Sequence, residues 1–388
     1  MRPRLFVAIA VAVAIVVALA GFVCLDPRPV QAGQDPSISS YKVLEPIRHG
    51  SLTVFPVVAP KSYATNEFLT LDEGLRSGEV LVTEYGSVRG LMRRHVTPAM
   101  QHDSAEVNRL VLINNSKRPL LLLAGEIVTG GKQDRVIGKD RIVPAESDPV
   151  DLSVFCVEPG RWVATSDQFG MSGTTNGNGS GGGIGGGVYH GIMAQPSVRS
   201  KAMGDKDQNQ VWAEVRKQQQ AMETVEVTAA APTASTNEIR STSSYAVVME
   251  NKDVKEKVDE IARPIEKNYK SLIKQLRDRN AVGVVVAVNG RIFWSDVFAS
   301  AELLEKYWPK LVRSYASEAV VARAKGGEAS LAQAEAFLAN MDGHRETIES
   351  EPGIYRHTEI NGDGFKAFAL TSLLPKTGFD VHVAKMAE

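Results

Sequence analysis

Two charged motifs in the sequence each follow an apolar run. They are LLLLAGEIVTGGKQDRVI, which begins at residue 120, and VFCVEPGRW, which begins at residue 154. Apolar runs bounded by glycine and proline are typical of buried strands. Each motif therefore predicts a strand that ends in a carboxylate, a glycine and a guanidinium. The residues that could touch a ligand are Glu126, Gly130, Gly131, Gln133, Asp134, Arg135, Glu158, Arg161 and Trp162.

If the two strand ends meet at one rim of a sheet, they form a pocket for a polar or anionic ligand. Glu126 and Glu158 could then act as general acid and base. Arg135 and Arg161 would present planar guanidinium groups that hold a carboxylate or a phosphate. Trp162 would offer a surface for stacking, and the remaining polar residues of the first motif would line the same pocket.

A structural interpretation of the same residues competes with this one. In it, the first motif is a hairpin whose Glu126 and Arg135 pair across two strands. The second motif is then an independent turn with its own surface ion pair. The first motif alone favours the hairpin, whereas the repeated layout of the second favours a shared site.

Other kinds of catalytic site are disfavoured by spacing. Cys156 and Arg161 are one residue too close for the phosphate-binding loop of a cysteine phosphatase, and the alternation around Cys156 predicts a buried strand residue. The histidines show no close metal-binding spacing. The glycine-rich stretch at residues 169–191 lacks the lysine of a phosphate-binding loop. We therefore predict neither a metal nor another cofactor.

The elements around the motifs predict an α+β fold. Short β-rich runs separated by turn residues fill residues 41–162, so we expect a β-rich N-terminal half with a mostly antiparallel or mixed sheet. Within it, TLDEGLRSG predicts a short helix capped by Thr70 and stopped at Gly78. The C-terminal half combines amphipathic helices with a β-hairpin at residues 282–298, which turns at an Asn-Gly pair. Antiparallel strands close the chain.

The domain organisation begins with a predicted export segment. An uninterrupted apolar run after MRPR predicts that residues 1–32 are either a cleaved signal peptide or a membrane anchor. Either version places the rest of the chain outside the cytoplasm, in the periplasm or secreted. We predict one α+β domain at residues 41–322, interrupted by a flexible loop at residues 169–191 and a polar linker at residues 224–244. Residues 323–388 form a helix and antiparallel strands that could share the same core.

Composition narrows the choice of partners. The chain has 388 residues, of which 43% are hydrophobic, and its 44 basic residues nearly balance its 45 acidic ones. This composition is typical of a globular protein and leaves no basic footprint for nucleic acid. We expect a small polar or anionic ligand, no nucleic acid, and membrane contact only through residues 5–25.

The order of the motifs resembles a known family. The chain resembles the ADP-ribosylglycohydrolase and rhodanese-phosphatase-superfamily-associated protein domain over residues 44–319. The resemblance is carried by LTVFPV, TLDEGLRSGEVLVTE, LLLLAGEIVTGGKQDRVI, VFCVEPGRW, QVWAEV, VGVVVAVNGRIFWSDVF and LEKYWPKLVRSYASEA. The resemblance implies no settled activity. It implies that the motif positions are Gly125, Glu126, Gly130, Gly131, Gln133, Asp134, Arg135, Cys156, Glu158, Arg161 and Trp162.

Two functions remain open from the sequence. The first is an exported domain that binds, and could hydrolyse, a small polar or anionic ligand, nucleotide-like or ADP-ribose-like, at a rim rich in Glu and Arg. In its enzymatic version Glu126 or Glu158 is the general base. The alternative is a non-enzymatic envelope or secreted interaction protein whose charged turns serve only the fold.

Overall fold

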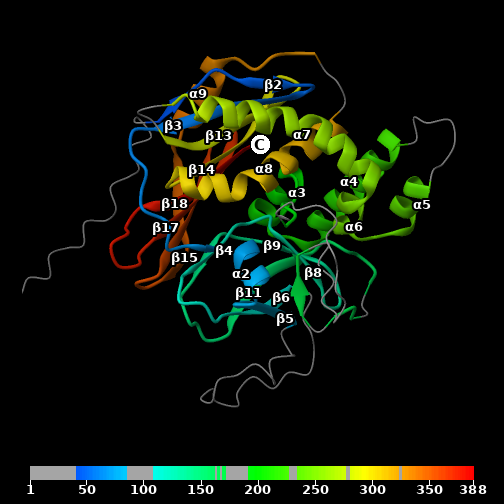
Figure 1. Ribbon diagram of the computed structural model, residues 1–388, viewed down its shortest axis with the longest axis horizontal. Helices are drawn as coiled ribbons and strands as arrows, with labels where there is room; N and C mark the ends of the chain where they lie inside the picture. Colours follow the sequence, from blue (N-terminus) through cyan, green and yellow to red (C-terminus); the bar gives the residue numbers. More distant parts are fainter. Residues whose placement is uncertain are drawn as a thin grey trace, which may run out of the picture. The chain divides into compact units, whose positions relative to one another are not determined.

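The computed structural model of the chain describes residues 41–84, 108–161, 164–166, 168–171, 191–226, 234–276, 280–322 and 326–388 (Figure 1). The predicted export segment at residues 1–32, Trp162, and residues 172–190 of the glycine-rich stretch lie outside them. Within the described residues, no helix combines the length and the apolar character needed to cross a membrane.

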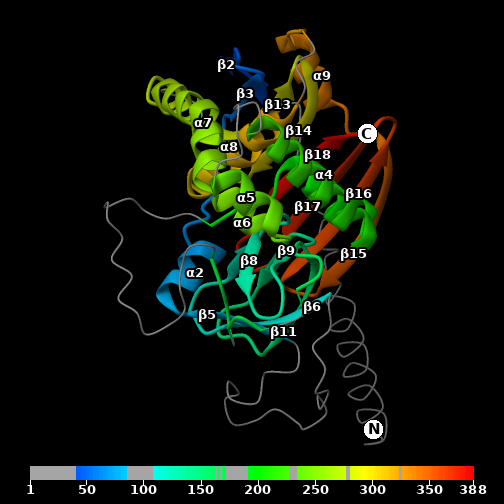
Figure 2. The same cartoon turned by 90° about the vertical axis from the view of Figure 1, so that its right-hand side faces the viewer.

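A large antiparallel sheet draws strands from both halves of the sequence. Its strands follow the order β1 (Lys42–Val43), β3 (Leu52–Ala59), β13 (Asn280–Val288), β14 (Arg291–Phe298), β18 (Asp380–Ala387), β17 (Phe365–Ser372), β16 (Tyr355–Gly362) and β15 (Gly343–Glu351), and β2 (Ile47–His49) pairs with β3 (Figure 2). Phe55 pairs with Val285, and Val297 pairs with Val383. The first strands, the predicted hairpin and the C-terminal strands therefore belong to one sheet.

The two motifs lie mainly in a second β-structure, a closed barrel. Its strands, in order around the barrel, are β11 (Val150–Cys156), β6 (Arg109–Asn114), β5 (Val80–Glu84), β12 (Phe169–Gly170), β8 (Ile127–Gly130) and β9 (Arg135–Ile137). Alternate residues of these strands form one apolar cluster, which includes Val82, Leu112, Val128, Ile137 and Val154. Side chains alternate between the two faces of a strand, so Glu84, two positions after Val82, and Arg135, two before Ile137, also point into the barrel.

A short sheet and a capped helix complete the barrel half. In that sheet β7 (Leu120–Leu122) pairs antiparallel with β10 (Arg141–Val143) and parallel with β4 (Leu69–Thr70). Helix α2 (Leu71–Ser77) begins after Thr70, whose side chain accepts a hydrogen bond from the Glu73 backbone, and stops at Gly78 with a φ of 73°. The predicted short helix and both of its ends are confirmed.

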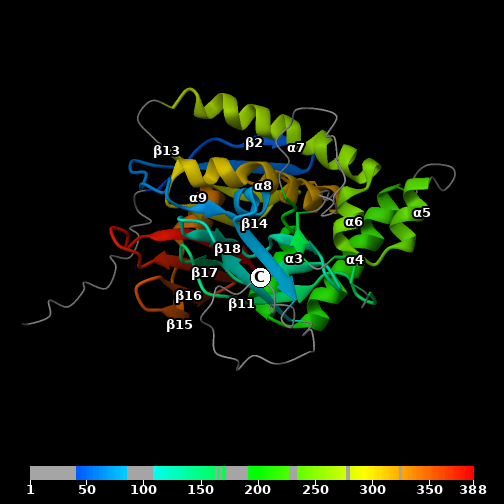
Figure 3. The same ribbon diagram turned by 60° about the horizontal axis from the view of Figure 1, so that its bottom comes forward.

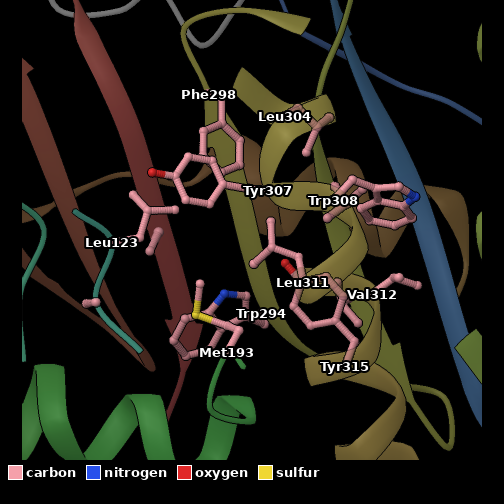
Figure 4. Close-up of a cluster of buried hydrophobic side chains, with 14 of the residues drawn as sticks. Leu123, Met193, Trp294, Phe298, Leu304, Tyr307, Trp308, Leu311, Val312 and Tyr315 are labelled. Atoms are coloured by element: carbon pink, nitrogen blue, oxygen red, sulfur yellow. The ribbon is translucent and has the colours of Figure 1, made fainter. Parts of the chain in front are cut away.

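Helices pack against the large sheet, against barrel strands and against one another. They are α3 (Pro196–Ser200), η3 (Lys201–Asp205), α4 (Gln208–Glu226), α5 (Ala234–Ser241), α6 (Tyr245–Glu250), α7 (Lys252–Ile273), α8 (Ala301–Val321) and α9 (Leu331–Ala339). Helix α8 packs on both α7 and β13 (Figures 1 and 3). Tyr307 and Leu311 of α8 meet Trp294 and Phe298 of β14 in the main core, which also contains Leu123 (Figure 4). Because Leu123 follows β7, the first motif is anchored in the same core as the C-terminal helices.

The arrangement confirms the predicted α+β fold. The N-terminal half is β-rich, and the C-terminal half combines helices with the β13–β14 hairpin. That hairpin turns at Asn289 and Gly290, which have φ angles of 51° and 79°. Two consecutive left-handed residues match the right-handed twist of the flanking strands, which is why the Asn-Gly pair predicted the turn.

Most of the described part of the predicted linker at residues 224–244 is helical. Helix α4 extends to Glu226, and α5 spans Ala234–Ser241. Ile239 of α5 is buried in the main core, and Arg240 Nε donates to Glu223 Oε1 at 2.6 Å. Thr236 and Ile239 are the buried residues of α5, and a single buried apolar position gives too weak a periodic pattern to predict a helix.

Candidate functional site

The β8–β9 hairpin carries the first motif. The leucines before it are fully buried, as the unbroken apolar run predicted. Gly130 and Gly131 make the turn with φ angles of 121° and 50°, and a side chain at Gly131 would collide with the Phe169 ring. Glycine is therefore required here by both backbone conformation and space.

The turn of this hairpin meets the second motif. Arg161 binds the Glu158 carboxylate through two hydrogen bonds, Nε to Oε1 and Nη2 to Oε2, each 2.6 Å long. The Asp134 backbone donates to Glu158 Oε2 at 3.0 Å, and Gln133 Nε2 donates to the Glu158 carbonyl at 3.0 Å. The structure thus brings together four of the predicted site residues. We call Gln133, Asp134, Glu158 and Arg161 the turn cluster.

Most of the turn cluster is closed on itself. Both oxygens of Glu158 already accept hydrogen bonds, and Arg161 Nη1 also donates to the Gly131 carbonyl at 3.0 Å. The Asp134 carboxylate accepts from Ser244 Oγ at 2.6 Å and from the Gly130 backbone at 3.1 Å. Burial and the charge of Glu158 raise the pKa of Asp134. These contacts join the two motifs but leave Glu158 no carboxylate oxygen without a partner.

Glu126 lies at the other end of the hairpin, away from Glu158. Its carboxylate binds the ammonium of Lys310 on α8 and accepts from the Leu123 backbone at 2.7 Å. Asp72 holds the same ammonium at 3.1 Å. Glu126 lies four positions before Gly130 along an extended chain, a distance of about 13 Å.

These contacts exclude both predicted roles of Glu126. Glu126 and Glu158 share no partner among the described residues, so the geometry does not bring them together as an acid–base pair. The competing prediction of a Glu126–Arg135 cross-strand pair is also wrong, because Lys310 takes Glu126. Burial, and then the charge of Asp72, raise the pKa of Glu126 against the opposing charge of Lys310. Lys310 lies 184 positions away in sequence, which is why no local pattern signalled it.

Arg135 faces a different partner, Glu84, inside the barrel. The Arg135 side chain is fully buried, and its Nη1 donates to the Gln133 carbonyl at 2.7 Å. Its Nη2 lies 4.0 Å from Glu84 Oε2. Glu84 Oε1 accepts from the Lys132 backbone at 2.7 Å. Burial lowers the pKa of Arg135, against the charges of Cys156, Glu84 and Asp134.

Several polar atoms of this group have no hydrogen-bond partner within the described parts of the chain. They are Nε and Nη2 of Arg135, Oε2 of Glu84 and Oε1 of Gln133. Buried polar atoms without partners are uncommon in folded proteins, and they point to a bound water or ligand. We call Glu84, Gln133 and Arg135 the barrel-end site. Sequence analysis missed Glu84, although its place two residues after Val82 was a signal for the barrel interior.

A second buried network was also missed by sequence analysis. The His382 ring lies between Asp140 and Asp296, with Nδ1 2.6 Å from Asp140 Oδ2 and Nε2 3.1 Å from Asp296 Oδ1. Arg199 binds Asp296 through two hydrogen bonds of 2.9 and 3.0 Å. Burial alone would lower the pKa of His382, but the two carboxylates outweigh it and raise the pKa to about 9. The network is therefore neutral overall, with two cations and two anions.

Gly125 of the first motif leaves space for the Arg199 side chain of this network. It has a φ of 96°, and a Cβ placed there would lie 2.5 Å from the Arg199 side chain. Arg199 Nε also donates to the neighbouring Ala124 carbonyl at 3.1 Å. The motif glycine therefore lets Arg199 cross the chain on its way to Asp296.

The remaining predicted residues have simpler surroundings. Cys156 is buried, as predicted, and burial raises the pKa of its thiol. Among the residues with described positions, no three His, Cys, Asp or Glu side chains are grouped so that they could hold a metal ion. A stacking role for Trp162 concerns a residue outside the described ranges.

Comparison with known proteins identifies a family but no individual relative. The model of the ARG and Rhodanese-Phosphatase-superfamily-associated Protein domain matches residues 40–385. The match extends beyond the resemblance at residues 44–319 and includes the C-terminal strands β15 to β17 and most of β18. No curated protein and no solved structure matches the chain.

Proposed function

This chain belongs to the ARG and Rhodanese-Phosphatase-superfamily-associated Protein domain family, and we propose that it binds a small ligand carrying an oxyanion at the barrel-end site. The family name states an association with other proteins and no reaction. The proposal therefore rests on the side chains of this chain.

One observation carries the proposal, the unpaired edge of Arg135. Nε and Nη2 lie along one edge of the planar guanidinium, and together they hold a carboxylate or phosphate through two parallel hydrogen bonds. In Arg135 this edge is buried and has no partner among the described residues. Each buried donor left without a partner costs about 1–3 kcal/mol. A bound oxyanion would remove that cost, and its charge would match Arg135.

The neighbouring acceptors restrict the ligand further. Glu84 Oε2 and Gln133 Oε1 need donors, and a bare anion beside Glu84 would be repelled. A ligand that offers both an oxyanion and a hydroxyl satisfies both requirements. Hydroxy acids, phosphate monoesters and ribose phosphates, including nucleotide-like and ADP-ribose-like molecules, belong to this class.

If the protein hydrolyses such a ligand, the general base would be a residue other than the predicted Glu126 or Glu158. Both oxygens of Glu158 accept hydrogen bonds, and Glu126 is occupied by Lys310 and Leu123. Glu84 Oε2, in contrast, lies beside the Arg135 edge without a hydrogen-bond partner. In a hydrolytic version Glu84 would therefore accept the proton of the attacking water.

Thermal stabilisation by defined ligands tests the proposal. Phosphate, tartrate, ribose 5-phosphate and ADP-ribose would each be titrated against the protein while its unfolding temperature is followed. We expect at least one of them to stabilise the protein, and Arg135→Gln to abolish that stabilisation. Arg263→Gln, an exposed arginine of α7, serves as the matched control. No stabilisation by any of the probes, or equal stabilisation of folded Arg135→Gln, would contradict the proposal.

One observation favours the alternative, a non-enzymatic exported interaction protein. The turn cluster is closed by its own hydrogen bonds, as expected of a charged turn that serves the fold. Export itself is proposed from the apolar run in residues 1–32. Fractionation of cells that make the full chain, with and without residues 1–32, tests it. Retention of the full chain in the cytoplasm would remove the basis for both exported versions.

A further inference from the structure

A cavity lies between the barrel and the large sheet. Its volume is about 350 Å³, at the lower end of the range found for ligand pockets. The barrel side contributes residues of β11 and of the segment after β9, and the sheet side contributes residues of β15, β16 and β17. Part of η3 completes the lining. None of the barrel-end residues lines this cavity, which we call the junction pocket.

His357 of β16 is the unusual residue in the junction pocket. It is only 1% exposed, yet neither ring nitrogen has a hydrogen-bond partner within the described part of the chain. Its ring is stacked near Phe368, with ring centroids 6.0 Å apart. A histidine almost always uses at least one nitrogen when it is buried. Both nitrogens of His357 are therefore available to a group inside the pocket.

The protonation state of His357 defines what that group can be. Burial lowers the pKa of His357 to about 4, and the charges of Lys139 and Lys206 also lower it, against Asp140 and Glu359. The ring is thus neutral at pH 7, with one nitrogen that donates and one that accepts. A partner must accept from the first nitrogen, and a hydroxyl group could donate to the second.

Two lysines, each paired with a glutamate, lie on one side of the pocket. Lys139 and Lys206 both line it, beside Glu349. Lys139 forms an ion pair with Glu349, and Lys206 binds Glu359 at 2.6 Å. Burial, followed by the charges of Arg141 and Lys206, lowers the pKa of Lys139. Neighbouring cations disfavour each other's charged form, and a bound anion between them would reduce this repulsion.

Apart from Asn108 and Ser153, the other side chains of the lining are apolar. Phe155 and Val154 come from β11, Met203 from η3, and Ile348 and Phe368 from β15 and β17. A free inorganic anion would leave these walls uncovered, and a purely apolar ligand would leave both ring nitrogens of His357 without a partner. The lining therefore fits a molecule with one apolar and one anionic end.

We propose that the junction pocket binds a small amphipathic organic acid, with its carboxylate near His357 and the two lysines and its aromatic or branched body against Phe155, Met203 and Phe368. This inference is independent of the barrel-end site. The two sites share no residue, and either could fail without the other.

Calorimetric titration with matched acids tests the proposal. Benzoate and 4-hydroxybenzoate contain both ends, acetate lacks the apolar body, and benzyl alcohol lacks the charge. We expect the two aromatic acids to bind with dissociation constants below about 1 mM, and the two partial ligands to bind at least about tenfold more weakly, since each loses one set of contacts. No binding of either aromatic acid would overturn the proposal.

His357→Leu separates a ligand site from a structural histidine. The leucine removes both unpaired nitrogens, so it should raise the unfolding temperature of the free protein while it weakens benzoate binding by about tenfold. His344→Leu, at an exposed position of β15, should change neither. A lower unfolding temperature together with unchanged benzoate affinity would assign His357 a structural role and contradict the proposal. Arg135→Gln should leave benzoate binding unchanged, which keeps this test separate from that of the barrel-end site.

Discussion

Glu84 and Arg135 face each other inside the barrel, with Glu84 Oε2 4.0 Å from Arg135 Nη2. The separation is too long for a hydrogen bond, and both atoms are buried without any hydrogen-bond partner in the described residues. A water or a ligand hydroxyl could bridge them with two bonds of ordinary length. In this the pair differs from Glu158 and Arg161 of the neighbouring turn cluster, which bind each other through two hydrogen bonds.

Neutralising Glu84 should alter stability and ligand affinity in opposite directions. Glu84→Gln keeps an acceptor for the Lys132 backbone but removes the countercharge of buried Arg135, so we expect a loss of about 2 kcal/mol in the free energy of unfolding. The same change removes the repulsion between the Glu84 carboxylate and a bound anion. At a separation of roughly 5 Å and an effective dielectric constant of about 20, this repulsion is about 3 kcal/mol. Phosphate should therefore bind at least about tenfold more tightly.

Urea unfolding and phosphate titration of Glu84→Gln measure the two effects. Glu335→Gln, at an exposed position of α9, is the control for the loss of one acidic charge. Phosphate affinity that stays the same or falls in Glu84→Gln would show that no anion occupies the space beside Arg135.

Lys310 should be essential for the fold, and Glu126 should be irrelevant to ligand binding. Lys310→Met leaves the buried carboxylates of Asp72 and Glu126 without a cation, and we expect a loss of about 3–5 kcal/mol. Adding Glu126→Gln should recover part of this loss, because one of the two negative charges disappears. A double-mutant cycle in urea measures the coupling. Glu126→Gln alone should retain thermal stabilisation by any ligand that stabilises the wild type.

Much of the fold could be predicted from the sequence because its signals are local. Thr70 and Glu73 cap the first turn of α2 and Gly78 ends its last turn. The Asn289–Gly290 turn needs only its two neighbours. The candidate site is different. Each decisive partner is distant in sequence, as with Lys310 for Glu126. The closure of the barrel, and with it the meeting of Glu84 and Arg135, depends on strand pairing that no local pattern specifies.

The sequence nevertheless predicted that residues of the two motifs would meet, although not which of them. Gln133, Asp134, Glu158 and Arg161 do meet around one turn, as the repeated layout suggested. The prediction for Glu126 went wrong because adjacency to the same apolar run does not fix which end of the hairpin a residue occupies. Alternation along β5 would have found Glu84 once the barrel interior was known.

The buried histidine network should make stability fall as the pH rises above neutrality. The pKa of His382 is raised to about 9 in the folded state, against about 6.5 in the unfolded chain. A raised pKa means that the folded state binds the proton more tightly, so the contribution is complete below pH 6.5 and is lost as the pH rises to about 9. Its size is on the order of 3 kcal/mol.

Urea unfolding between pH 6 and 9.5 checks this dependence against His382→Asn. The variant is needed as a reference because Lys385 also titrates in this range. Its pKa is lowered to about 8 in the folded state, so its contribution makes stability rise with pH above 8. We expect the difference in unfolding free energy between wild type and variant to shrink as the pH rises. A constant difference would mean that His382 is neutral in the fold.

A side chain at Gly125 should destabilise the protein because it would collide with Arg199, and Gly160 provides a matched control without that collision. Gly125 and Gly160 have nearly equal φ angles of 96° and 98°, but only at Gly125 would a Cβ meet another group within 4 Å, the Arg199 side chain. Both alanine variants carry the backbone strain, about 1–2 kcal/mol. Gly125→Ala should lose a further 1–3 kcal/mol or so by displacing Arg199 from Asp296. Equal losses in urea unfolding would place Arg199 elsewhere.

The central claim, that the open edge of Arg135 receives an oxyanion, can be observed at the atom itself. The Nε–H group of a buried arginine gives a resolvable NMR signal, which is assigned here by its loss in Arg135→Gln. On titration with phosphate and with ADP-ribose, we predict that this signal shifts and saturates along with the thermal stabilisation, while the Nε–H signal of Arg263 stays unchanged. Saturable binding that leaves the Arg135 signal in place would contradict the claim.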